Sequence, residues 1–291
     1  MIFLELYRKR LAHTGQLQAL YGDKMDDRLK RLFDAGYIDW PPVQKMWRHP
    51  GSGSRPNAWA LGNLGAWALV AEGRITEARA KDWGENNRRL KRSSLFMPHT
   101  LAVNDVKVAF RVACMRRGLM YIPGERLVRN GLARALDIPG RRRPLMTDDT
   151  FAIAREGKEP ALFFVEADRD TETNIPGDTA SERELVASDL WGSDWYGETT
   201  SESLLFKFEG YFGYARAQKQ VEQFGIKNFR TLTITTGSEK RVLNIAKAAY
   251  RGCHGVEVRR YLTTNFDALK LADPFDAPWF DASGSLLALA L

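Results

Sequence analysis

The sequence predicts an α/β (α+β) protein with two domains, and three observations support this prediction. The chain has 291 residues, 44% of them hydrophobic, so it can bury a full core and favours two domains over one. Stretches with apolar residues at three- and four-residue steps, typical of helices, alternate with short β-branched and aromatic runs, typical of strands. One apolar run, residues 162–170, ends abruptly in acid. Buried carboxylates need a cation, a metal or solvent beside them, so this run marks a candidate site.

The first part of the chain predicts two helices followed by a hairpin. Residues 15–21 form a short helix, and a second helix begins near Lys24 and ends before Gly36, which suits a left-handed C-cap. Strands follow at residues 37–40 and 58–61, joined by a loop rich in Gly, Ser and Arg. This order, with the segments LKRLFDAGYI and AWALG, resembles many winged helix-turn-helix domains.

Basic residues gather in this first domain. The whole chain carries a formal charge of +7 and has a pI near 9.4, which favours a polyanionic partner such as nucleic acid. We expect Lys24, Arg28 and Arg31 to face the phosphates or base edges of double-stranded DNA, and Arg48 and Arg55 to lie in the wing. The alternative is that these charges form a solvated helix face in a domain that contacts proteins.

The expected domains are a winged-helix domain at residues 1–80, a basic linker at 81–97 and a second domain at 98–291. A helix at residues 99–117 opens the second domain. A strand near residues 121–122 and another at 145–154 follow it, and a turn at residues 157–160 then leads into the acidic run.

The acidic run gives the candidate site. In a strand, alternate residues point to opposite faces, so Glu166 and Asp168 share one face. The hairpin formed with the preceding strand is expected to bring Asp149 close to Glu166. On the helix predicted for residues 204–223, Lys207 and Tyr211 share one face because they are four residues apart. A strand at residues 231–235 and a helix at 240–250 follow.

This order of elements resembles the core of the PD-(D/E)XK, or restriction-endonuclease-like, fold with its mixed sheet. The resemblance implies that Asp149 and Glu166 bind Mg²⁺, with Asp168 as a further candidate, and that Lys207 assists catalysis. The sequence departs from the usual Glu-x-Lys motif, because Asp168 stands where a lysine is expected. A relocated lysine on the next helix, Lys207, can fill that role.

The sequence also resembles the replication-relaxation family of plasmid and mobile-element proteins. The similar segments are HTLAVNDVK at residues 99–107, TDDTFAI at 147–153, FVEADRDTE at 164–172 and KFEGY at 207–211, preceded by the winged helix. This resemblance spans most of the chain and implies a role on bacterial DNA. The acidic stretch at residues 174–201 is longer than the family pattern leads us to expect.

Several other classes of protein are disfavoured. The two cysteines lack zinc-finger spacing and are expected to be thiols in a reducing cytoplasm; no apolar run is long enough for a membrane span. The four histidines form no His-x-His pair for a tyrosine relaxase, and no phosphate-binding Gly-x-x-x-x-Gly-Lys loop is present. The sequence does not decide the oligomeric state, and a homodimer is one possibility.

Two functions therefore remain. The first is a magnesium-dependent DNA endonuclease that docks through its winged helix. The second is a non-catalytic DNA-binding accessory or regulator of replication or transfer. In that case Glu166 and Asp168 form structural ion pairs with Arg169, Lys207 or the arginines at residues 141–143.

Overall fold

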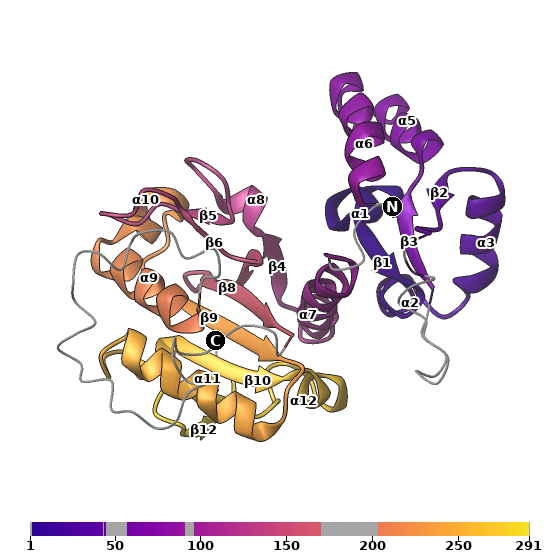
Figure 1. The fold of residues 1–291 in the computed structure, drawn as a ribbon. Helices are drawn as coiled ribbons and strands as arrows, with labels where there is room; N and C mark the ends of the chain where they lie inside the picture. The colour runs from indigo at the N-terminus through magenta and orange to yellow at the C-terminus, as the bar shows by residue number, and fades with distance from the viewer. Residues whose placement is uncertain (1, 43, 45–56, 91–95, 170–202, 291) are drawn as a thin grey trace. The chain divides into compact units, whose positions relative to one another are not determined.

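The chain forms two compact units, Met1–Val112 and Ala113–Leu291, each described here by itself. The structure is a computed structural model that describes residues 2–42, 44, 57–90, 96–169 and 203–290 (Figure 1). No helix within these described ranges is long and apolar enough to cross a membrane. Both cysteines, Cys114 and Cys253, are buried free thiols.

The first unit is mainly helical and contains a small antiparallel sheet of strand order β1-β3-β2. Its helices are α1 (Ile2–Lys9), α2 (Thr14–Tyr21), α3 (Asp26–Asp34), α5 (Asn63–Ala71), α6 (Glu77–Leu90) and most of α7 (Phe96–Arg116). Its strands are β1 (Leu11–His13), β2 (Ile38–Asp39) and β3 (Ala58–Leu61). The expected helices, the C-cap glycine with φ 76° at Gly36 and the return strand are all present. Helices α1, α5 and α6 were not among the expected elements.

A capping box fixes the start of α2. The imidazole Nδ1 of His13 accepts from the Gln16 backbone N at 3.2 Å, and the Gln16 side chain accepts from the His13 backbone N at 3.1 Å. These bonds satisfy two of the free N–H groups at the helix start. The same Gln16 side chain donates to the Leu101 carbonyl of α7 at 2.9 Å. The capping residue and the long helix are therefore tied together.

The long helix α7 belongs largely to the first unit. Its Met97 and Leu101 pack in a cluster with Leu11 of β1, and Asn104 donates to the backbone carbonyls of Lys9 and Leu11 at 3.2 and 2.7 Å. We expected this helix to open the second domain at residue 98, whereas the units divide after Val112. Part of the expected linker is also helical, since α6 runs to residue 90 and buries Trp83.

The second unit is built on a seven-stranded mixed sheet of order β12-β11-β10-β9-β8-β7-β4. Its strands are β4 (Met120–Pro123), β7 (Asp149–Ala154), β8 (Ala161–Asp168), β9 (Phe229–Thr235), β10 (Tyr261–Asn265), β11 (Trp279–Asp281) and β12 (Leu286–Leu287), beside the small hairpin β5 (Ala135–Leu136) and β6 (Leu145–Met146). Strands β8, β9 and β10 are parallel, and the outer pairs are antiparallel.

Helices pack on one face of this sheet. They include α9 (Leu204–Arg216), α10 (Lys219–Phe224) and α11 (Glu239–Gly252). The second unit also contains three short helical segments: α8 (Gly124–Leu127), the 3₁₀ turn η3 (Val258–Arg260) and α12 (Phe266–Leu271). The helix expected at residues 204–223 is divided by Gln218, which has a left-handed φ of 54°. Helices α9 and α11 meet closely, because a Cβ at Gly252 would lie 2.6 Å from the Cβ of Phe208. The rings of Phe164 on β8 and Tyr211 on α9 stack with their centroids 5.7 Å apart, so the face of the sheet that carries Phe164 packs against α9.

Candidate functional site

Glu166 and Asp168 lie at the carboxyl end of β8, on the face of the sheet covered by α9. Both side chains are buried, with 1% of each residue exposed. Because β8 and β9 are parallel, their carboxyl ends meet at one edge, where α11 begins after β9. The two carboxylates therefore have partners from two different helices.

Glu166 is held by α9. Lys207 Nζ lies 2.9 Å from its Oε2, and the Tyr211 hydroxyl donates to its Oε1. Burial raises the pKa of Glu166 to about 7; the ammonium of Lys207 lowers this pKa and the nearby charge of Asp148 raises it. Burial and the Glu166 charge together hold the pKa of Tyr211 well above its ordinary value, so the phenol stays protonated and donates.

Asp168 is held by the start of α11 and the end of β9. Arg241 Nε donates to its Oδ2 at 2.9 Å and Nη2 to its Oδ1 at 3.0 Å, a bidentate pair. The Thr235 hydroxyl, directly opposite on β9, also donates to Oδ2 at 2.7 Å. The Asp168 side chain is fully buried, so this pairing compensates the charge of a carboxylate that water does not reach.

The structure does not bring Asp149 to Glu166. Asp149 pairs across the hairpin with Val165, and directly paired residues share a face, so Asp149 and Glu166 lie on opposite faces of the sheet. The expected meeting of these two residues is therefore wrong. The neighbouring Asp148 is the acid near Glu166: its Oδ2 accepts from the Ala167 backbone N at 2.8 Å, and its charge raises the pKa of Glu166.

The residues present do not fit the expected magnesium site. Of the three proposed ligands, Asp149 faces away, and each carboxylate oxygen of Glu166 and Asp168 already accepts a hydrogen bond from a side chain. Within the described parts of the chain, no three or more His, Cys, Asp or Glu side chains are grouped so that they could hold a metal ion. The arrangement is a set of neutralised carboxylates rather than an open donor set.

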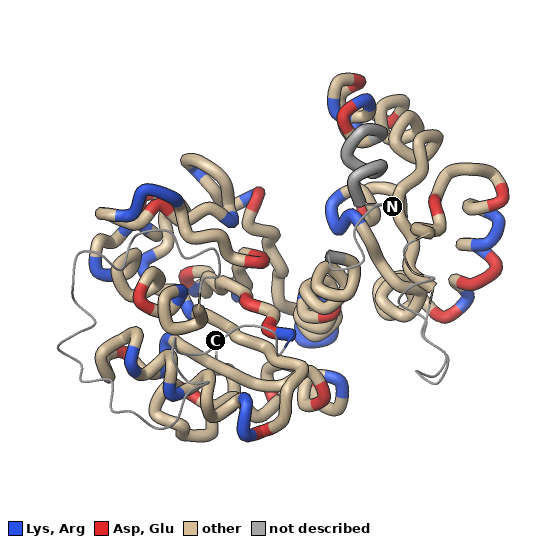
Figure 2. Tube along the Cα trace, viewed as in Figure 1, with Lys and Arg blue, Asp and Glu red and all other residues tan. Residues whose placement is uncertain are grey.

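The expected DNA-binding side chains are exposed where the structure describes them. These are Lys24, just before α3, and Arg28 and Arg31 within it. Helix α3 is not uniformly basic, since Arg28, Lys30 and Arg31 are matched in number by Asp26, Asp27 and Asp34, and Figure 2 shows both signs along it. Arg48 and Arg55 lie outside the described residues.

Charge is divided unequally between the two units. The sequence of residues 1–112 holds 19 Lys and Arg and 11 Asp and Glu, a formal charge of +8. The sequence of residues 113–291 holds 24 and 25, a formal charge of −1. The basic character of the chain therefore resides in the first unit.

Sequence reasoning missed Asp148, Thr235 and Arg241 as members of this site. Asp148 precedes Asp149, and only the strand register decides which of two adjacent acids shares the face of Glu166. Arg241 had a usable signal. It lies in the first turn of the helix after a strand parallel to β8, which places it at the edge where Asp168 ends.

Fold and site define a two-unit protein with a basic, mainly helical first unit and a mixed-sheet second unit whose strand-end carboxylates are ion-paired. The model of the Replication-relaxation family matches residues 3–188, more than half of the chain, and the protein belongs to this family. The match confirms the resemblance seen in the sequence, and membership implies a role in plasmid replication. No curated protein and no solved structure matches the chain.

Proposed function

We propose that this protein is a non-catalytic DNA-binding accessory or regulator of plasmid replication. Its basic first unit binds double-stranded DNA, and its second unit is a nuclease-like domain that does not cleave. The observation that carries this proposal is the bidentate pairing of Asp168 with Arg241, at the position where a nuclease of this type has its lysine.

The nuclease-like character rests on element order. Strands β4, β7 and β8 form an antiparallel meander, and α9 then leads to β9, which is parallel to β8. This order resembles the PD-(D/E)XK core, with Glu166 near the end of the third strand. A retained fold with internally paired carboxylates fits a domain that binds DNA or a partner without cutting.

DNA binding is supported by the charge of the first unit and by the exposed arginines of α3. A formal charge of +8 on the sequence of residues 1–112 attracts the phosphate backbone whatever the base sequence. The aspartates on α3 repel the negatively charged phosphates, so only part of this helix is expected to contact the DNA backbone.

The second candidate is metal-dependent cleavage of DNA, and one observation favours it. Lys207 Nζ lies 2.9 Å from Glu166 Oε2, and this proximity supports a catalytic role for a lysine relocated to α9. The register that puts Asp149 and Glu166 on opposite faces of the sheet weighs against cleavage, as does the lack of a group of three metal-ligating side chains among the described residues.

Fluorescence anisotropy with a labelled DNA duplex tests the proposal, using the full chain in EDTA and again in Mg²⁺. The proposal predicts similar affinity under both conditions, a steep loss of affinity with added salt, and intact DNA on a denaturing gel afterwards. Absence of binding in EDTA, or shortened DNA in Mg²⁺, would contradict it.

A further inference from the structure

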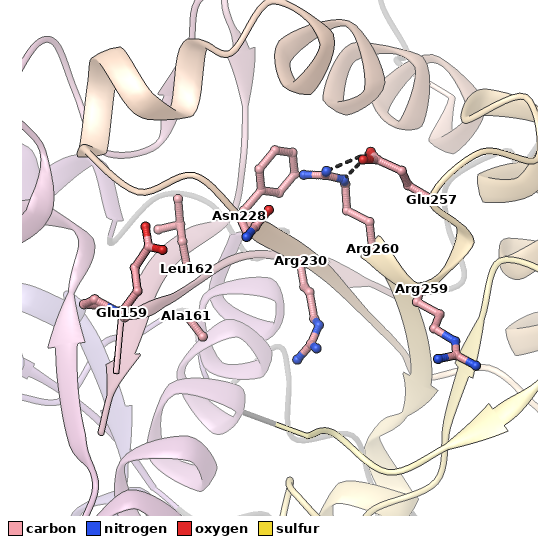
Figure 3. A pocket seen from close by; sticks show the side chains of 10 residues that line it. Glu159, Ala161, Leu162, Asn228, Arg230, Glu257, Arg259 and Arg260 are labelled. Atoms are coloured by element: carbon pink, nitrogen blue, oxygen red, sulfur yellow. Dashed lines mark hydrogen bonds and ion pairs between the residues drawn. The ribbon is translucent and has the colours of Figure 1, made fainter. Parts of the chain in front are cut away.

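A pocket of about 350 Å³ lies where the chain enters β8 and β9, at the opposite end of β8 from Glu166 (Figure 3). Its polar lining consists of Glu159, Asn228, Arg230, Glu257, Arg259 and Arg260. None of these side chains takes part in the Glu166 and Asp168 pairings, so the pocket is a separate feature of the second unit.

The pocket has an acidic side and a basic side. Glu159 comes from the turn before β8, whereas Arg259 comes from η3, just before β10. Because β9 lies between β8 and β10, these two side chains approach from opposite sides, with Asn228 and Arg230 of the β9 entry between them (Figure 3).

The Arg260 side chain, on the basic side of the pocket, is held in place by its contacts with Glu257 and Phe229. Its Nε and Nη2 donate to Glu257 Oε2 at 2.9 and 2.7 Å, and its guanidinium carbon lies 4.6 Å from the centre of the Phe229 ring. The remaining nitrogen, Nη1, is buried and has no hydrogen-bond partner among the described residues. An unsatisfied guanidinium N–H costs free energy unless a ligand or water accepts from it.

Two further guanidinium groups are available. Arg259 is exposed and has no side-chain partner in the parts of the chain that the structure describes. Arg230 lines the pocket and donates through Nη1 to the Ala290 carbonyl, which leaves further N–H donors on the same guanidinium group. Guanidinium groups bind phosphate oxygens through paired donors, and two such groups on one small pocket match a dianion better than a single carboxylate.

The acidic side of the pocket indicates which functional groups the rest of the ligand carries. Glu159 Oε1 accepts from the Lys227 backbone N at 3.2 Å, and the exposed carboxylate keeps acceptor capacity for a hydroxyl or amino group. Asn228 both donates and accepts. A molecule with phosphate at one end and hydroxyl or amino donors at the other complements both sides, and a nucleotide has this distribution.

We propose that this pocket binds a nucleotide, with its phosphate on Arg230 and Arg259 and its sugar or base at Asn228 and Glu159. The volume suits one small ligand. The nucleotide is either free or the 5′-phosphorylated end of a DNA strand. The site is independent of whether the first unit binds duplex DNA.

Titration calorimetry of the full chain with deoxyadenosine monophosphate tests this proposal. We expect saturable binding that weakens by about tenfold or more in the Arg230→Ala/Arg259→Ala variant, and binding of deoxyadenosine that is weaker by a similar factor. The matched control, Arg155→Ala/Lys158→Ala, removes two exposed positive charges from the neighbouring turn and should bind as the parent does. Equal affinity of the parent and the pocket variant, or of nucleotide and nucleoside, would overturn the proposal.

Arg259→Ala alone provides a second variant, since its exposed side chain supports no described contact and the fold does not depend on it. It should weaken nucleotide binding without changing the thermal unfolding midpoint, and unchanged binding would count against the site. Competition then distinguishes the sources. A short 5′-phosphorylated oligonucleotide displaces the nucleotide if the pocket takes a strand end, and it fails to do so if the pocket takes only free nucleotide.

Discussion

Arg241 binds Asp168 through two hydrogen bonds, from Nε at 2.9 Å and from Nη2 at 3.0 Å, across 73 positions of sequence. This pairing gives a cation partner to the acid that stands where the nuclease motif that the sequence resembles has a lysine. A lysine here would place a second cation beside Arg241. The pair thus connects the end of β8 to the start of α11 and leaves the Asp168 carboxylate engaged by a cation from the protein itself.

Replacing Arg241 with Ala should destabilise the second unit strongly. It leaves Asp168 buried without its cation, which typically costs about 3 to 5 kcal/mol. Arg241→Lys should recover only part of this loss, because an ammonium cannot form the bidentate pair. Urea unfolding of the three proteins measures the difference, and a change below about 1 kcal/mol for Arg241→Ala would mean that the pair is not structural.

Glu166 should make stability depend on pH. Its pKa rises from 4.5 to about 7 on folding, so folding favours the protonated form. Its contribution is therefore complete below pH 4.5 and is lost as the pH rises toward 7, at about 1.4 kcal/mol per pH unit. The stability of the parent relative to Glu166→Gln should fall across this window and be flat above it. Parallel pH profiles for the two proteins would refute this assignment.

Lys207 should matter most at high pH. The Lys207→Met variant removes the cation from an ionised, buried Glu166 at pH 8, whereas at pH 5 the carboxyl is protonated and needs the cation less. We expect a loss of about 3 to 5 kcal/mol at pH 8 and a smaller one at pH 5. Thermal unfolding at both pH values checks the difference. An equal loss at both would show that Lys207 acts through packing instead of charge.

Arg28 and Arg31 should contribute to DNA affinity. Replacing both with Ala removes two exposed cations from α3, so duplex binding should weaken and its dependence on salt should flatten. Arg74→Ala/Arg79→Ala is the matched control, because it removes two exposed cations from the same unit. Anisotropy titrations at several salt concentrations compare them. If both variants weaken binding equally, α3 has no special place in the interface.

Much of the sheet could be predicted from the sequence because its central strands carry clear signals. The hairpin of β7 and β8 consists of two nearly continuous apolar runs joined by a Gly-containing turn, and α9 has a regular apolar stripe. The position of Lys207 followed from the same periodicity. The face of the sheet on which Asp149 lies could not be predicted in this way, because a shift of one residue in register exchanges the two faces of a strand.

The domain boundary and the Arg241 pairing depend on long-range contacts. Helix α7 is apolar along much of its length, and its bonds to α1, β1 and α2 tie it to the first unit. Examples are the bonds from Asn104 to the Leu11 carbonyl and from Gln16 to the Leu101 carbonyl. The sequence places Arg241 in the first turn of the helix after a strand, but its contact with Asp168 also requires the parallel pairing of β8 and β9, which local sequence does not encode.

A plasmid-nicking assay tests the central claim most directly. Supercoiled DNA is incubated with the parent protein, Glu166→Ala and Lys207→Ala in Mg²⁺ and in EDTA, with duplex binding measured in parallel. We predict that the parent binds DNA and leaves the plasmid supercoiled in Mg²⁺, with no difference in cleavage among the three proteins. Magnesium-dependent nicking by the parent that both substitutions abolish, with DNA binding retained, would contradict the account and establish a nuclease.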